Sequence, residues 1–183
     1  MNINTTKPLG IIVFILCLCA VHVSFGQTHK SGDSTMVWSP PDKAFSINVP
    51  VTLKDAKTTY KDTSHSGYKT IKLFGGKKSG YVFVVYDLDL VEEATKRSLE
   101  DKLGGLEFVL GGDDDYEFVE TYIKIGGLDA RQIVYANQNK KGLIIDAGGR
   151  IYILGLSTKD RKDLDSAVAE RFFTSFRLLN EKK

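Results

Sequence analysis

The sequence predicts an α+β domain in which a large antiparallel sheet is flanked by two main helices. Expected strands dominate the chain, Gly-Gly links join several of them, and no strand–helix–strand alternation occurs. Gly-Gly links favour tight hairpins, which make neighbouring strands antiparallel. A parallel doubly wound sheet would instead need a helical crossover after each strand.

Residues 1–26 have the features of a secretory signal peptide. Lys7 supplies a positive charge, Ile11 to Val21 is an unbroken apolar run, and Ser24-Phe25-Gly26 suits cleavage before Gln27. The apolar run is shorter than the roughly 20 residues that span a bilayer. We therefore expect a periplasmic or extracellular protein with no transmembrane segment in its mature chain.

Both cysteines, Cys17 and Cys19, lie within this signal segment. A bacterial lipidation motif requires a small residue before the cysteine, whereas Leu16 and Leu18 precede these two, so ordinary cleavage is favoured over lipid attachment. The mature chain would then contain no thiol. This excludes disulfides, thiolate nucleophiles and cysteine metal sites.

The rest of the chain is expected to hold one domain. Residues 27–35 are small and polar and predict a flexible leader, residues 36–179 form the single α+β domain, and residues 180–183 form a C-terminal tail. The formal net charge of +2 is nearly balanced, so it gives no indication of nucleic acid or an anionic membrane as a partner.

Strands and turns are expected first along the domain. Phe45, Ile47 and Val49 alternate with polar residues up to Pro50, which predicts a strand. A weaker strand is expected at 51–60, a loop at 62–67, a strand at 68–74, a turn at 75–80 and a central strand at 81–86.

A helix is expected to follow these strands. Asp89 and Glu92 resemble a capping box, and Leu99, Leu103, Leu106 and Leu110 form one apolar stripe at helical spacing. Gly104 and Gly105 interrupt the stripe, so the helix either continues through them or ends at Leu103.

The second half predicts an antiparallel meander, a helix and an edge strand. The expected strands are 116–125, 128–136, 143–147 and 151–157, followed by a helix at 160–173 and a last strand at 176–179.

The order of these segments resembles the Mog1/PsbP-like α/β/α sandwich family of small exported bacterial proteins. The resemblance rests on "FSINVP", "YVFVVYDLDL", "YIKIGGLDARQIVY", "GGRIYILGLS" and "AERFFTSFRLL", and it covers residues 45–179. Members include a partner-binding adaptor of a small GTPase and an extrinsic subunit of a photosynthetic complex. The resemblance therefore implies a binding or accessory module that is generally non-enzymatic, and it assigns no functional residue here.

Motifs for metal, phosphate or nucleophilic chemistry are incomplete. Asp113-Asp114-Asp115 with Glu117 offers oxygens to Ca²⁺ but lacks the EF-hand glycine and glutamate, so a solvated loop is favoured. Ser64-His65-Ser66 with Asp62 is crowded into a polar loop and has no nucleophile elbow. Only His29 and His65 remain in the mature chain, which disfavours a zinc site.

The segment Gly75-Gly76-Lys77-Lys78-Ser79-Gly80 superficially suggests a phosphate loop. The Walker pattern requires Ser or Thr directly after Gly-Lys, but Lys78 stands there. We interpret the segment as a β-turn with a basic tip. No cofactor or metal is therefore expected.

One strand carries a candidate recognition surface. Phe118, Glu120 and Tyr122 share one side of it, and Val119, Ile123 and Ile125 on the other side predict core. Aromatic and basic side chains suit binding, although packing of the rings beneath a helix is the favoured interpretation. The candidate binding surface comprises Tyr122, Lys124, Arg131, Tyr135, Arg150 and Tyr152.

Three functions remain open at this point. The favoured function is a non-catalytic binding or accessory module that recognises a protein partner or a small ligand through its sheet. The first alternative is a hydrolase that uses carboxylates such as Asp87, Asp89 and Asp113–Asp115. The second alternative is a structural subunit of an envelope complex, which predicts an exposed apolar patch.

Overall fold

A computed structural model describes residues 34–56, 67–103, 106, 110 and 117–179. All of these belong to one compact unit of the chain. The expected signal peptide, most of the expected leader, the polar loop around His65, the Asp113–Asp115 run and the C-terminal tail lie outside the described residues.

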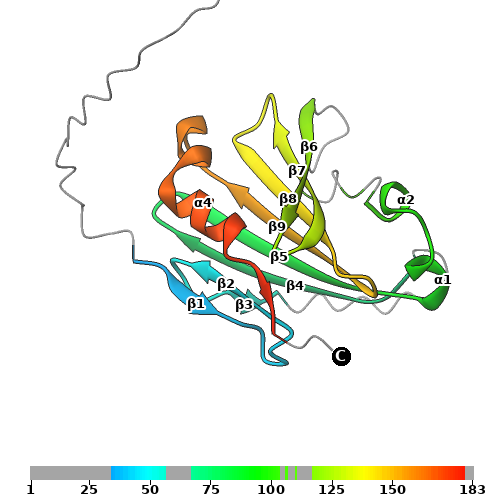
Figure 1. Cartoon of the computed structure of the whole chain (residues 1–183). Helices are drawn as coiled ribbons and strands as arrows, with labels where there is room; N and C mark the ends of the chain where they lie inside the picture. The colour runs from blue at the N-terminus through cyan, green and yellow to red at the C-terminus, as the bar shows by residue number, and fades with distance from the viewer. Residues whose placement is uncertain (1–33, 57–66, 104–105, 107–109, 111–116, 180–183) are drawn as a thin grey trace, which may run out of the picture. The chain divides into compact units, whose positions relative to one another are not determined.

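A seven-stranded antiparallel sheet forms the centre of this unit (Figure 1). Its spatial order is β3-β4-β5-β9-β8-β7-β6, and every neighbouring pair is antiparallel. The strands are β3 (Lys54–Asp55), β4 (Tyr68–Lys78), β5 (Tyr81–Leu90), β6 (Phe118–Ile125), β7 (Leu128–Tyr135), β8 (Lys140–Asp146) and β9 (Arg150–Ser157). The predicted sheet-rich, antiparallel α+β architecture is confirmed.

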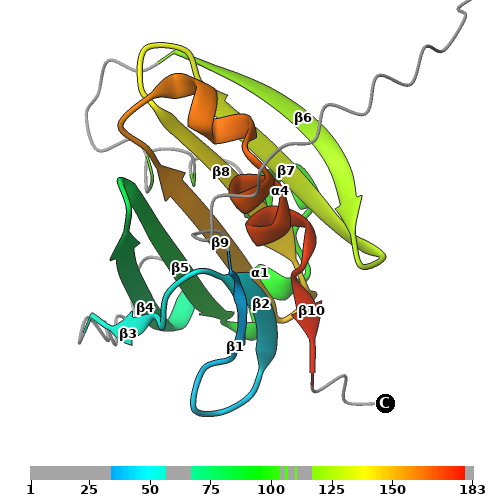
Figure 2. The same ribbon diagram turned by 90° about the vertical axis from the view of Figure 1, so that its left-hand side faces the viewer.

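A small second sheet and a helix cover one face of the large sheet, called here the α4 face. The small sheet has the order β1-β2-β10, with β1 at Met36–Trp38, β2 at Phe45–Val49 and β10 at Arg177–Leu178. Beside it lie the 3₁₀ turn η1 (Arg161–Asp165) and helix α4 (Ala167–Thr174), as Figure 2 shows. The Phe83 and Phe172 rings meet edge to face at 5.1 Å, which joins β5 to α4.

The opposite face, called here the α2 face, carries a second hydrophobic cluster. Two short helices contribute to it, α1 (Glu92–Thr95) through Ala94 and α2 (Leu99–Leu103) through Leu103. Strand register explains the division, because alternate residues of one strand point to opposite faces. Ile153 of β9 therefore packs on the α2 face, while Leu154 packs on the α4 face.

The single helix expected from Asp89 is wrong in its boundaries. Strand β5 continues to Leu90, and the helical segment is divided into α1 and α2. Ser98 begins α2, because its hydroxyl accepts a hydrogen bond from the Asp101 N–H at 3.1 Å and donates one to the Asp101 carboxylate at 2.6 Å. Leu103 and Leu106 are nevertheless buried, as the leucine stripe predicted.

The turn expected at 75–80 is also shorter than predicted. Strand β4 runs on to Lys78, and only Ser79 and Gly80 form the turn, with φ angles of 51° and 88°. Two consecutive positive φ angles define the type I′ turn that suits a right-twisted hairpin. The basic hairpin tip is confirmed, but its lysines lie in the strand and not in the turn.

Candidate functional site

The six residues of the predicted binding surface lie on both faces of the sheet. Tyr122 is opposite Arg131, which is opposite Ile144 and then Ile153, so these residues share the α2 face. Arg150 and Tyr152 alternate with Ile151 and Ile153 on β9 and therefore face α4. The six side chains do not form one continuous surface.

Burial separates the six residues further. Tyr135 and Tyr152 are almost completely buried, in different hydrophobic clusters. Arg131 is also buried, donates to the Leu103 carbonyl at 2.6 Å and pairs with Glu120 at 3.2 Å. Its role is to hold α2 against the sheet. Only Tyr122 and Lys124 present most of their side chains to solvent.

Strand β6 differs from its expected pattern on the other side as well. Val119, predicted as core, is 68% exposed, whereas Ile125 is buried. Strand β6 lies at one of the two edges of the large sheet. Of its α4-face residues, only Ile123 and Ile125 join the cluster that includes α4.

Asp87 is the most deeply buried carboxylate in the described part of the chain. It is 2% exposed on the α4 face, and its Oδ2 lies 3.3 Å from Arg150 and 4.0 Å from Lys72. Lys72 also binds Asp42 of the β1–β2 loop at 2.7 Å. Among the described residues, Asp87 Oδ1 has no hydrogen-bond partner.

Burial raises the pKa of Asp87, because a desolvated carboxylate is disfavoured, and the nearby Asp42 and Asp89 carboxylates act in the same direction. Arg150 and Lys72 oppose this shift without cancelling it. Burial alone would raise the pKa of Asp42. Hydrogen bonds from Lys72 and the Ala44 N–H outweigh this effect, so the pKa of Asp42 is lowered. The cluster thus links the β1–β2 loop to the large sheet.

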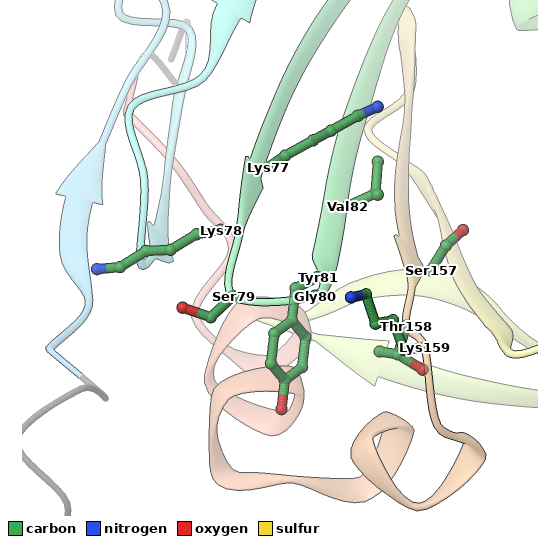
Figure 3. Close-up of a pocket in the computed structure, with 9 residues that line it drawn as sticks. All are labelled: Lys77, Lys78, Ser79, Gly80, Tyr81, Val82, Ser157, Thr158 and Lys159. Atoms are coloured by element: carbon green, nitrogen blue, oxygen red, sulfur yellow. The ribbon is translucent and has the colours of Figure 1, made fainter.

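A pocket lies at the β4–β5 turn, beside the end of β9 (Figure 3). It has a volume of about 380 Å³. Its lining combines lysine and hydroxyl side chains with the apolar Val82 side chain, while the Tyr81 ring points toward α4 on the other face of the sheet (Figure 3). The residues are Lys77, Lys78, Ser79, Gly80, Tyr81, Val82, Ser157, Thr158 and Lys159, and we call this the lysine pocket.

The charges of the lysine pocket are largely unbalanced. Lys77 and Lys159 are exposed, and within the described ranges neither forms an ion pair with a carboxylate. The Lys78 side chain extends away from the turn and donates to the Pro50 carbonyl at 2.9 Å. Two lysines are therefore available to an anion, and a third fixes the hairpin.

A second, smaller pocket of about 190 Å³ shares Ser157 with the lysine pocket. Val84, Tyr86, Leu110 and Gly155 give it apolar walls, and Lys140 lies at its edge. Since Ser157 is opposite both Val82 and Lys140, the two hollows adjoin across β9 on the α2 face. Together they offer cationic groups beside an apolar floor.

Sequence reasoning recognised the basic hairpin but did not assign it to a site. The missing information was the position of Lys159, which is distant in sequence and reaches the hairpin because β9 pairs with β5. The stem of Lys159 would lie 3.5 Å from a Cβ at Gly80. Alternation within single strands cannot reveal such a neighbour.

Neither Asp87 nor Asp89 lines the lysine pocket or its smaller neighbour. The described residues contain no cluster of three or more potential metal ligands. No helix in the described ranges is long and apolar enough to cross a membrane.

No protein-family model and no curated protein matches this chain.

Proposed function

We propose that this protein is an exported, non-catalytic binding module that holds a small organic anion in the lysine pocket. The observation that carries this proposal is the presence of Lys77 and Lys159, without acidic partners among the described residues, around an open hollow with an apolar floor. A ligand with a carboxylate, sulfonate or phosphate and an apolar body would satisfy both parts of the site.

The size of the expected effects follows from exposure. Each solvent-exposed charge contact contributes about 0.2–1 kcal/mol, so two lysines alone give weak binding. Contact with the Val82 side chain adds apolar burial at about 25 cal/mol per Å². The proposal therefore requires both a negative charge and an apolar body on the ligand.

Export and family resemblance support the same function. Residues 1–26 have the composition of a cleavable signal, which would deliver the domain to the periplasm or the exterior. Helices on both faces of an antiparallel sheet agree with the layer order of the Mog1/PsbP-like sandwich. Within that resemblance, accessory and binding roles are expected and catalysis is not.

The binding function is favoured over the carboxylate hydrolase because Asp87 is engaged elsewhere. Its neighbours are the Arg150 and Lys72 cations, and it lies next to the buried Tyr152. A hydrolytic carboxylate must reach the substrate, and Asp87 lines neither of the two adjoining hollows.

The proposal is tested with two probes that share an aromatic body. The probe 8-anilinonaphthalene-1-sulfonate is anionic, and N-phenyl-1-naphthylamine is its uncharged counterpart. We expect the anionic probe to bind with one-to-one stoichiometry and to weaken as NaCl is raised from 20 to 500 mM, which screens exposed charges. The neutral probe should bind less tightly under every condition.

Matched variants locate the site. Lys77→Ala and Lys159→Ala should each weaken binding of the anionic probe by about two- to fivefold, which corresponds to loss of one exposed charge contact. Lys69→Ala removes an exposed lysine from the same strand, outside the pocket, and should bind as the unmodified protein does. Equal binding by all three variants, with unchanged circular dichroism, would contradict the proposal.

A further inference from the structure

Strand β6 forms one edge of the large sheet, and no described strand pairs with the outer side of its residues 119–125. It is outermost in the strand order, and β7 is its sole partner among the described strands. Its eight residues include Val119 and Tyr122, which are 68% and 53% exposed. A long edge with exposed apolar residues is a template for pairing with another strand.

The β6–β7 hairpin determines which backbone groups point outward. The two-residue turn Gly126-Gly127 has φ angles of 59° and 87°, and it is closed by the pair Ile125 and Leu128. In such a hairpin the closing pair exchanges hydrogen bonds, and bonded and non-bonded pairs then alternate. The Ala136 N–H donates to the Glu117 carbonyl at 2.7 Å, which agrees with this alternation.

Odd-numbered residues of β6 therefore bond to β7, and even-numbered residues direct their N–H and C=O groups outward. The outward groups belong to Glu120, Tyr122 and Lys124. A partner strand must bond to these residues, which limits the registers that it can adopt.

A second copy of β6 matches these groups when the strands pair antiparallel with Tyr122 opposite Tyr122. Glu120 then lies opposite Lys124 of the second copy, and Lys124 opposite its Glu120. Opposite charges across an antiparallel pair stabilise it. If the register is shifted so that Thr121 lies on the two-fold axis, Glu120 lies opposite Tyr122 and both charge pairs are lost.

Neighbouring charges extend this complementarity. Within one copy, Lys124 already pairs with Asp129 at 2.6 Å, and Glu120 pairs with Arg131 at 3.2 Å. Pairing of two β6 strands would place these groups in an alternating row of acid and base. Lys124 and Glu120 would each then have an opposite charge on both neighbouring strands, one within the same copy and one from the second copy.

The other side of the paired strands would be apolar. Val119 would lie opposite Ile125 of the second copy, and Thr121 opposite Ile123. These are the closely spaced, non-bonded pairs of an antiparallel ladder, in which side chains contact most directly. This contact would cover Val119, which is more exposed than Tyr122, the other exposed large hydrophobic residue of β6.

We propose that the protein forms a two-fold symmetric dimer in which β6 pairs antiparallel with β6 of a second copy. Tyr122 lies on the two-fold axis, and the two large sheets join into one continuous antiparallel sheet. The dimer uses the opposite edge of the sheet from β3 and β4, so the β4–β5 turn remains away from this interface.

Disulfide cross-linking in the full chain tests the register. Cys17→Ala and Cys19→Ala first remove the natural thiols. Tyr122→Cys then places two thiols across a bonded pair, about 5.5 Å apart between Cα atoms, within disulfide range. We expect a covalent dimer under mild oxidation with copper phenanthroline.

Matched controls make this result specific. Glu120→Cys alone and Lys124→Cys alone should remain monomeric on a non-reducing gel, since equivalent positions would be roughly 13 Å apart along the strands. An equimolar mixture of these two variants should cross-link, because position 120 faces position 124. Cross-linking of either variant alone, or failure of Tyr122→Cys, would overturn the proposed register.

Sedimentation measures the association without a cross-link. The unmodified protein should show concentration-dependent dimer, and Tyr122→Pro should raise the dissociation constant at least tenfold. Proline removes an N–H that only the second copy would use, and edge strands tolerate it. A protein that remains monomeric up to about 1 mM would overturn the proposal. Should Tyr122→Pro not fold, Lys124→Glu, which opposes Glu120 with a like charge, provides the same comparison.

Discussion

At the level of single residues, Asp87 is the carboxylate whose environment departs most from water. Two cations lie near one of its oxygens, while the other oxygen is buried without a partner among the described residues. Desolvation outweighs the attraction of Arg150 and Lys72, so the pKa of Asp87 is raised. The group therefore binds a proton more readily in the folded than in the unfolded chain.

This shift predicts how stability depends on pH. Between the unfolded-state pKa of about 3.9 and the raised folded-state pKa, the folded chain holds more protons than the unfolded chain. The stability that Asp87 contributes is thus present at low pH and lost as pH rises through this window, by at most about 1.4 kcal/mol per pH unit.

Asp87→Asn removes the titration and isolates this contribution. The free energy of unfolding of the unmodified protein minus that of the variant should fall as pH increases above 4, measured by urea denaturation. A difference that increases over this range would show that the pKa of Asp87 is lowered in the folded chain, contrary to the structure.

Residue roles were the part of the site least accessible from sequence. Tyrosine is a residue type common in recognition surfaces, but Tyr135 and Tyr152 are buried in two different hydrophobic clusters. Arg150 and Arg131 look alike in sequence, and register places them on opposite faces. Such assignments depend on strand pairing, which single-strand alternation does not determine.

At the level of elements, two paired glycines shape the α2 face. Gly142 of β8 is opposite Gly155 of β9, and a Cβ at either position would collide with Leu110. At Gly155 a Cβ would also lie 2.6 Å from Val84 Cγ2. The glycines leave a recess in the sheet that accommodates the Leu110 side chain.

Gly155→Ala should therefore destabilise the protein by about 1–3 kcal/mol, because the added methyl group would overlap the Leu110 and Val84 side chains. Gly149→Ala is the matched control, since a Cβ there meets no atom within 4 Å, and its effect should stay within about 0.5 kcal/mol. Chemical denaturation compares both variants. Equal stability of Gly155→Ala and the unmodified protein would contradict the close packing of Leu110 and Val84 against Gly155.

Elements were predicted well where local chemistry determined them. The Gly-Gly turn gave the β6–β7 hairpin, and apolar alternation gave β2 with its observed bounds. The helix after β5 was predicted as one piece because the leucine stripe masked the Ser98 cap that begins α2. Strand β1 was missed because Met36–Trp38 is too short for a periodic pattern.

At the level of the whole molecule, the sequence predicted the antiparallel α+β class and the meander correctly. The lysine pocket was not predicted, because it depends on a long-range pairing of β9 with the β4–β5 hairpin. Sequence order predicted which strands pair within hairpins. The lysine pocket, in contrast, is formed by strands that are distant in the chain.

The proposed export predicts a defined mature chain. If residues 1–26 are removed as the signal composition indicates, mass spectrometry of the protein purified after secretion should find Gln27 as its first residue. A mature form that begins at Cys17 or Cys19 and carries a lipid would contradict ordinary cleavage and place the domain on a membrane anchor.

The central claim is that the lysine pocket binds organic anions. The most direct measurement is a titration of the ¹⁵N-labelled protein with 8-anilinonaphthalene-1-sulfonate, followed by amide chemical shifts. The account predicts that the largest shift changes cluster at residues 77–82 and 157–159, which line the pocket. Shift changes centred elsewhere, or none at millimolar probe, would contradict it.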